Sequence, residues 1–283
     1  MSTASPSGVD FTHPVPDASS FTFPPVVGQK VFVLGLGGGC DIITAYAIST
    51  LLNEQAREII YANTKTTRSV GPTKPVTPHT VRVASHMPEP GRSVSGLGRA
   101  AIDHGVPRRG ESPWIVLLED ALAESELVSE IRSLGFDLIV GVDTGGDSIA
   151  HKKGRGHRGR DQRMLRILAQ VGVPLLHVVV APGSDGEAST ADLLAVFERE
   201  VTAGRYRGSF SLGSLLPVYR TLSVGLAPTR TPKIILSAAD GQLARTKDER
   251  LVIVPRGKQP AVPPHWLTSA FVFAPEMPTP QSA

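Results

Sequence analysis

Three apolar runs in this chain end in glycine-rich turns that carry carboxylates, and this recurrence limits the fold more than any other feature. The turns are Gly35-Leu36-Gly37-Gly38-Gly39-Cys40-Asp41, Gly141-Val142-Asp143-Thr144-Gly145-Gly146-Asp147 and Pro182-Gly183-Ser184-Asp185-Gly186-Glu187. Each run predicts a buried strand that leads into a tight turn and then a helix. The carboxyl ends of parallel strands share one edge of a sheet, where ligands bind. We therefore expect the three turns to line one cleft.

The pattern along the chain alternates between strands and helices. We expect strands at about 30–35, 59–62, 81–84, 137–142, 175–180, 233–236 and 251–254, and helices at about 41–55, 118–134, from 161, and 193–201. This alternation is typical of an α/β protein with a doubly wound, mostly parallel sheet and helices on both faces. We predict a single domain at 28–273, preceded by a disordered lead-in rich in proline and serine at 1–27 and followed by a flexible tail at 274–283.

Composition narrows the class of protein. Hydrophobic residues make up 41% of the chain and aromatic residues only 5%, so aliphatic side chains must fill the core. A formal net charge of +3 does not favour nucleic-acid binding, and the single cysteine excludes an intrachain disulfide. No apolar segment approaches the ~20 residues of a membrane span. The first 27 residues contain no lysine or arginine, unlike a targeting signal, so we expect a soluble cytoplasmic protein.

The first turn has the features of an anion site. Gly37, Gly38 and Gly39 leave room for close approach to the backbone, and the following helix would point its positive dipole end at the ligand. The dinucleotide-binding fingerprint fails because its third glycine falls at Cys40. After the second strand, Asn63 and Lys65 stand where a ribose-binding acid would be, and they suit a phosphate or carboxylate.

Asp41, in the first turn of the same helix, has two interpretations. A carboxylate there would repel a bound phosphate unless a metal ion lay between them. Alternatively, Asp41 caps the helix, as aspartate commonly does.

The second and third turns concentrate carboxylates. Asp143 and Asp147 flank Gly145 and Gly146, and such charge density needs cations, N–H donors or a ligand to compensate it. Mg²⁺ or Ca²⁺ would suit these oxygen ligands. The carboxylates can instead accept hydrogen bonds from sugar hydroxyls or ring N–H groups, or only from amides of the loop.

The third turn repeats this pattern before a helix that we expect to be capped at Ser189 or Thr190. We predict metal-ligand or general-base roles for Asp143, Asp147 and Asp185. Gly186 and Glu187 are expected to contact the bound ligand, and Glu187 and Asp161 are expected to support the three carboxylates. The amides of Gly145 and Gly146 would help to cradle the anion.

A basic run occupies residues 151–160, with five lysines or arginines and three glycines. Charge runs of this kind are usually solvated surface insertions, and this is the favoured interpretation. The alternative is a flap that delivers arginine or lysine to an anionic substrate or to nucleic-acid phosphates. No aromatic residues are interleaved, so base stacking is not indicated.

The three turns, in this order and spacing, resemble the motifs of the family known as domain of unknown function 1152, from about residue 30 to residue 225. Gly71-Pro72 resembles a further element of that family, and Asp161 matches one of its aspartates. The family usually has glycine at the position of Cys40. It also carries a glutamate and a Ser-Pro pair where this chain has its basic run. The resemblance implies a Rossmann-like fold and no established reaction.

Together these features predict an enzyme that acts on a small anionic metabolite, such as a nucleotide or sugar phosphate, with Mg²⁺ as the expected cofactor. A hydrolase or transferase fits better than a hydride-transfer enzyme because the dinucleotide fingerprint is broken. The alternative is a non-catalytic module that binds a metabolite or contacts nucleic acid. A catalytically inactive protein that retains the cleft is also compatible with the sequence.

Overall fold

The computed structural model describes residues 21–52, 56–65, 73–83, 113–119, 121–150, 159–186, 188–247, 249–255 and 261–275. Several predictions fall outside these ranges. They concern residues 1–20 of the lead-in, Gly71-Pro72, residues 151–158 of the basic run, Glu187, and most of the tail.

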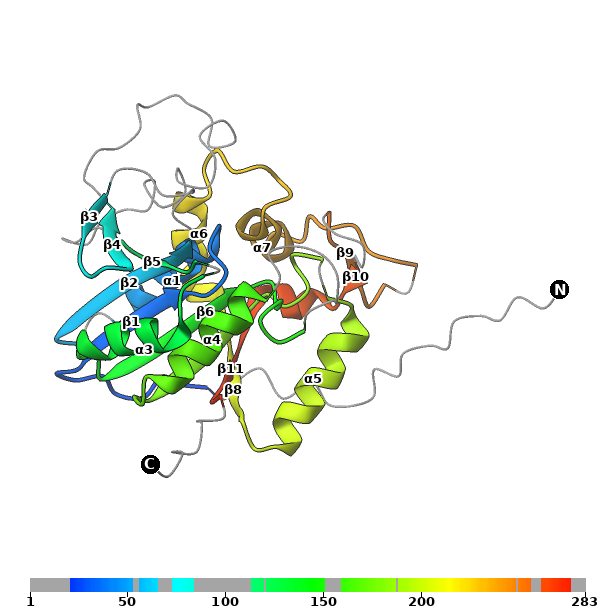
Figure 1. Cartoon of the computed structure of the whole chain (residues 1–283). Helices are drawn as coiled ribbons and strands as arrows, with labels where there is room; N and C mark the ends of the chain where they lie inside the picture. The colour runs from blue at the N-terminus through cyan, green and yellow to red at the C-terminus, as the bar shows by residue number, and fades with distance from the viewer. Residues whose placement is uncertain are drawn as a thin grey trace.

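Within the described residues, nine strands form one sheet in the order β3-β4-β5-β2-β1-β6-β7-β11-β8 (Figure 1). Their bounds are β1 Lys30–Gly35, β2 Glu58–Lys65, β3 Thr73–Pro75, β4 Thr80–Val83, β5 Trp114–Leu117, β6 Leu138–Thr144, β7 Leu175–Val180, β8 Tyr206–Ser211 and β11 Ser269–Phe273. A separate antiparallel pair consists of β9 (Val252–Ile253) and β10 (Ala261–Val262).

The predicted mostly parallel sheet is confirmed. The central strands β5, β2, β1, β6 and β7 pair in parallel. The antiparallel strands β4 and β11 flank them, so β3 and β8 again run in the common direction. Chain order reverses between β1 and β6, because β2 lies on one side of β1 and β6 on the other. In open α/β sheets, ligands bind at such a reversal, outside the carboxyl ends of the strands.

Helices cover both faces of the sheet, as expected for a doubly wound fold. They are α1 (Asp41–Leu52), α3 (Glu124–Ser133), α4 (Arg160–Gln170), α5 (Thr190–Thr202), α6 (Leu216–Leu222) and α7 (Thr231–Ala239), with short 3₁₀ turns at Gly213–Leu215 and Pro264–Thr268. Side chains alternate across a strand. In β1, Val31 and Val33 face the cluster of α1, α6 and α7, whereas Phe32 and Leu34 face that of α3 and α4.

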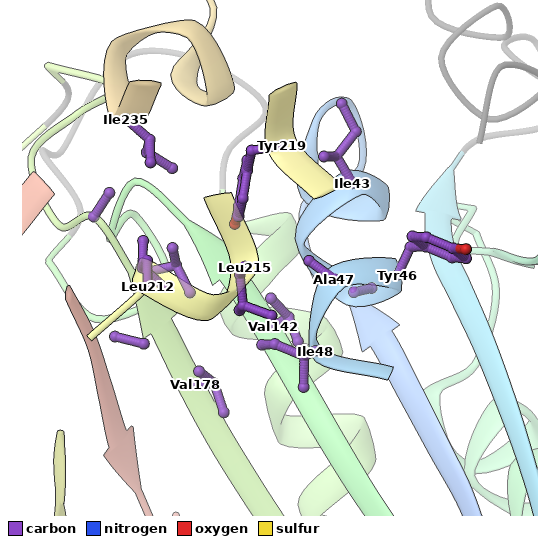
Figure 2. Packing of buried hydrophobic residues seen from close by; sticks show 14 of the residues in the cluster. Ile43, Tyr46, Ala47, Ile48, Val142, Val178, Leu212, Leu215, Tyr219 and Ile235 are labelled. Atoms are coloured by element: carbon purple, nitrogen blue, oxygen red, sulfur yellow. The ribbon is translucent and has the colours of Figure 1, made fainter. Parts of the chain in front are cut away.

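The first of these clusters joins elements that are distant in the sequence. Figure 2 shows Ile48 of α1 beside Val142 of β6 and Leu215, with Tyr219 of α6 above them. All four side chains are buried. Because aliphatic residues dominate this cluster, the low aromatic content of the chain is sufficient to build it.

Local expectations failed where short apolar runs were ambiguous. Residues 233–236 are helical within α7, not a strand; Pro232 in the first turn of this helix favours its start. The helix expected at 118–134 is confined to Glu124–Ser133, and the missed strand β5 precedes it. The helix after the third turn begins as expected, with a capping box between Ser189 and Asp192.

The last residues of the predicted lead-in pack on the domain. The Phe21 N–H donates to the Ser209 carbonyl at 3.0 Å, Phe21 and Phe23 contact Phe210, and Val26 is buried. The predicted division of the chain at residue 27 therefore cuts through a packed segment. The wider division into lead-in, domain and tail stays a prediction.

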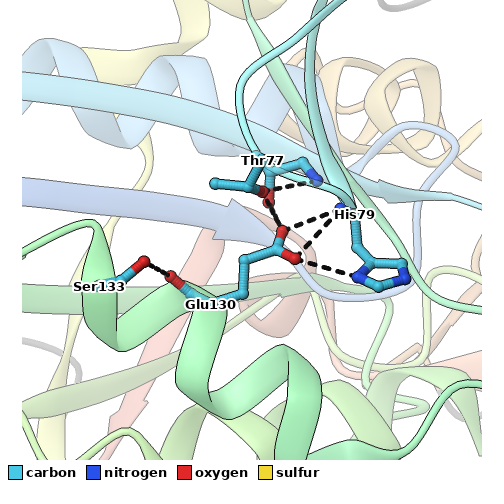
Figure 3. Close-up of polar contacts among 5 residues, drawn as sticks. Thr77, His79, Glu130 and Ser133 are labelled. Carbon is cyan, nitrogen blue, oxygen red and sulfur yellow. Dashed lines mark hydrogen bonds and ion pairs between the residues drawn. The ribbon is translucent and has the colours of Figure 1, made fainter.

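Glu130 of α3 ties this helix to the turn between β3 and β4 (Figure 3). Its carboxylate accepts hydrogen bonds from the Thr77 hydroxyl, the His79 N–H at 3.1 Å and the Thr80 hydroxyl at 2.9 Å. The His79 Nδ1 lies 3.0 Å from the same carboxylate, and the Glu130 side chain is only 8% exposed. One buried side chain thus satisfies several donors of a turn at the sheet edge.

We expect Glu130→Ala to lower the free energy of unfolding by about 2 kcal/mol, because the Thr77, His79 and Thr80 donors lose their acceptor. Chemical denaturation measures the change. Glu126→Ala, on the exposed side of the same helix, is the matched control. An equal loss in both variants would contradict a specific role for Glu130.

Candidate functional site

The first turn is held by Asp41, which begins α1. Its carboxylate accepts a hydrogen bond from the Gly37 N–H at 2.9 Å and from the Thr144 N–H at 3.3 Å. The donors therefore lie in the first and second turns, and neither belongs to the amides of α1. Asp41 thus joins two turns that are separated by about a hundred residues of sequence.

The second turn is organised around Asp143. Its carboxylate accepts hydrogen bonds from the Gly146 N–H at 3.3 Å, the Ser148 N–H at 2.9 Å and the Ser148 hydroxyl. His177 of β7 reaches the same serine, with Nε2 at 2.8 Å from Oγ. Since the serine proton is used on Asp143, the His177 Nε2–H donates to Ser148. Asp143 therefore accepts hydrogen bonds from amides of its own loop and from the Ser148 hydroxyl, and its role as a metal ligand stays a prediction.

The third turn contacts the second. The Gly183 N–H donates to the Gly145 carbonyl at 2.6 Å. Gly145 has φ +133°, and a Cβ there would lie 2.7 Å from Cγ of Asp185, so the buried Asp185 carboxylate packs directly on this glycine. Gly186 is buried with φ +68°. The expected meeting of the three turns is thus seen in their contacts.

Asp161, in the first turn of α4, completes the group of carboxylates. It packs so closely on Gly37 that a side chain there would overlap it. Asp147 forms a hydrogen bond with it. Asp143, Asp147 and Asp161 each offer an oxygen within 4.8 Å of the other two. We call these three residues the carboxylate trio. It contains Asp161 in place of the Asp185 that we predicted as a metal ligand from the sequence.

Burial and mutual repulsion dominate the electrostatics of this site. Burial raises the pKa of Asp41 well above its ordinary value, and Asp161 and Asp143 raise it further. Burial likewise raises the pKa of Asp147, with Asp143 as the strongest repulsive neighbour. The pKa of Asp161 rises to about 7 through burial and the charge of Asp143, against the opposing charge of Arg160. These carboxyl groups therefore favour protons or cations.

The pKa of His177 shifts in the opposite direction. Burial lowers its pKa to about 4, so the imidazole is neutral near pH 7. A neutral ring carries one N–H, which serves as the donor to Ser148. Its role here is to orient the serine that holds Asp143.

Asn63 and Lys65, predicted to face the ligand, lie at the end of β2. The Asn63 amide donates to the Gly39 carbonyl at 3.4 Å, and its Oδ1 accepts from the Thr64 N–H at 3.2 Å. Lys65 is buried, with 2% exposure. Asn63 therefore stabilises the first turn through the Gly39 carbonyl. Its contact with a ligand stays a prediction.

Sequence reasoning missed some of the residues that build this site. Ser148 follows the second turn directly, yet no motif distinguishes it. No spacing pattern singled out His177, because its partner lies 29 positions away. Asp161 was predicted only to support the site, whereas in the structure it is one of the three clustered carboxylates.

Comparison with known proteins supports one relationship. Residues 119–248 match a family described as protein of unknown function (DUF1152), which confirms the resemblance expected from the turns over that segment. The match includes the second and third turns and the carboxylate trio. No curated protein and no solved structure matches the chain. Among the described residues, every helix is too short or too polar to cross a membrane.

We expect Asp161→Asn to stabilise the metal-free protein above about pH 7. The pKa of Asp161 rises from 3.8 to about 7 on folding, so between these values folding takes up a proton and wild-type stability falls as pH rises. Asparagine removes this penalty. The advantage should be absent at about pH 4 and grow to a few kcal/mol by about pH 8. Denaturation in a chelator measures it, and parallel pH curves would contradict it.

Proposed function

We propose that the carboxylate trio and the adjoining glycine turns bind a small anionic metabolite together with a divalent cation. The observation that carries the proposal is the approach of three carboxylate oxygens, from β6, its turn and α4, to within 4.8 Å of one another. Their position beside the reversal between β1 and β6 supports it, because ligands of open α/β sheets bind there.

A divalent cation is the simplest compensation for this charge. The ionised forms of Asp147 and Asp161 are destabilised by burial and by repulsion from Asp143, and the pKa values of both are raised for this reason. Mg²⁺ and Ca²⁺ bind carboxylate oxygens, and Mg²⁺ is commonly held by one or two carboxylates plus the phosphates of a substrate. We therefore propose Mg²⁺ as the resident ion, with Asp147 and Asp161 as its main protein ligands.

The proposed activity is hydrolysis or group transfer on the bound metabolite. A metal ion in such a site polarises a phosphoryl or carbonyl oxygen. Asp185, which packs on Gly145 beside the trio, is the proposed general base. Asp143 has three donors on its oxygens and is proposed to position the turn as well as to contact the ion.

Binding of Mn²⁺, a spectroscopic substitute for Mg²⁺, tests the proposal directly. Asp147→Asn should weaken Mn²⁺ binding by at least about tenfold, because loss of a carboxylate ligand should cost no less than loss of an outer-shell partner. Electron paramagnetic resonance titration measures free and bound Mn²⁺. Asp240→Asn removes a carboxylate that pairs with Arg220 outside the trio and should leave the affinity unchanged.

Unchanged Mn²⁺ affinity in Asp147→Asn would refute the metal site. A thermal-shift and turnover screen of nucleotides and sugar phosphates, with and without Mg²⁺, then tests the reaction. Stabilisation with turnover supports the enzyme. Stabilisation without turnover of any compound in the screen would favour the non-catalytic metabolite-binding module instead.

A further inference from the structure

Arg160, the last residue of the basic run, begins α4 and packs against the first turn. A Cβ built on Gly38 would lie 3.6 Å from Nη2 and 3.7 Å from Cζ of Arg160. The guanidinium therefore lies beside Gly38, at the distance of an ordinary van der Waals contact from a side chain there, whereas the Thr64 carbonyl oxygen would clash with that Cβ. Gly38 adopts φ +82°, which further restricts this position to glycine.

The Nε atom of Arg160 is buried and has no hydrogen-bond partner within the described part of the chain. A buried donor without an acceptor is costly, and a guanidinium presents its N–H groups in a planar fork that matches phosphate and carboxylate oxygens. The unused donor lies beside the turn that opens α1, a 12-residue helix whose positive dipole end also favours anions.

Two oppositely charged side chains lie beside neighbouring glycines of this turn. The Asp161 carboxylate packs on Gly37, and the Arg160 guanidinium lies beside Gly38. Arg160 also lowers the pKa of Asp161, although burial and Asp143 outweigh it. A ligand that meets both groups must offer an anion to Arg160 and a cation to the carboxylates. A phosphate with a bound Mg²⁺ meets this requirement, since Mg²⁺ commonly bridges carboxylates and substrate phosphates.

We propose that Arg160 and the backbone of Gly38 and Gly39 form the phosphate subsite, so that the substrate is a phosphorylated metabolite whose phosphate lies between Arg160 and the carboxylate trio. This inference rests on the proposed function and names its substrate class. Arg160 is then the specificity-determining residue that selects phosphorylated over unphosphorylated compounds.

Isothermal titration with pyrophosphate, and separately with Mn²⁺ alone, tests the subsite. Arg160→Gln should weaken pyrophosphate binding by about tenfold or more, because a charge-assisted hydrogen-bonding group is lost. Arg160→Lys should have an intermediate effect, since it keeps the charge without the fork. The affinity for Mn²⁺ alone should not fall in either variant, because removal of a nearby positive charge does not disfavour a cation.

Arg166→Gln is the matched control, because Arg166 lies on the same helix and its side chain is 61% exposed. Melting temperatures verify that each variant is folded, and Arg160→Lys keeps the test valid if Arg160→Gln does not fold. Equal pyrophosphate affinity in wild type and both Arg160 variants would overturn the inference. An equal loss in Arg166→Gln would also overturn it, since net charge alone would then explain the effect.

The two proposals fail in distinguishable ways. If the wild type binds Mn²⁺ but not pyrophosphate, the phosphate subsite is refuted and the metal site stands. If pyrophosphate binds in an Arg160-dependent manner without Mn²⁺ binding, the subsite is supported and the metal site is refuted.

Discussion

Close contact between carboxylates and glycine backbone is the constraint on which this site depends. Asp161 occupies the space in which a side chain at Gly37 would lie, and Asp185 does the same at Gly145. Each pair joins segments far apart in the sequence, so the missing Cβ atoms allow α4 and the third turn to approach the sheet edge. The turns are therefore rich in glycine for two reasons: the backbone bends sharply, as at Gly145 with φ +133°, and it receives a neighbouring carboxylate.

The carboxylates themselves divide into two groups. Asp143 has its oxygens engaged by Ser148 and Gly146, and His177 orients that serine through its single N–H. Asp147 and Asp161 share a hydrogen bond with each other, and burial raises the pKa of both. A carboxylate with several hydrogen-bond donors therefore lies beside two carboxyl groups whose burial and mutual repulsion favour the protonated form.

Sequence reasoning succeeded where the information was local. An apolar run that ends in glycine predicts a strand and a turn, and parallel-sheet topology then brings such turns to one edge, which the Thr144–Asp41 and Gly183–Gly145 contacts bear out. It failed where tertiary context decides. A short segment such as 233–236, with the three apolar residues Ile234, Ile235 and Leu236, suits a strand or a helix equally. Packing against α6 and the 3₁₀ turn at Pro264–Thr268 selects the helix in α7. The partnership of Asp147 with Asp161 is likewise invisible in the sequence, because spacing alone says nothing about which carboxylates share a buried hydrogen bond.

A chain of buried hydroxyls connects this edge to the C-terminal half of the protein. Thr144 donates to Thr44 at 2.8 Å, and Thr44 lies 2.8 Å from the Tyr219 hydroxyl of α6. All three side chains are buried, so these hydroxyls form hydrogen bonds with one another in place of hydrogen bonds to water. Burial also raises the pKa of Tyr219, so the phenol stays protonated at physiological pH. The Thr144 N–H also donates to Asp41, whose carboxylate joins the first two turns. Hydrogen bonds therefore connect α6 to that carboxylate through Thr44 and Thr144. The aliphatic cluster around Tyr219 thus stabilises the fold and also fixes the orientation of the site.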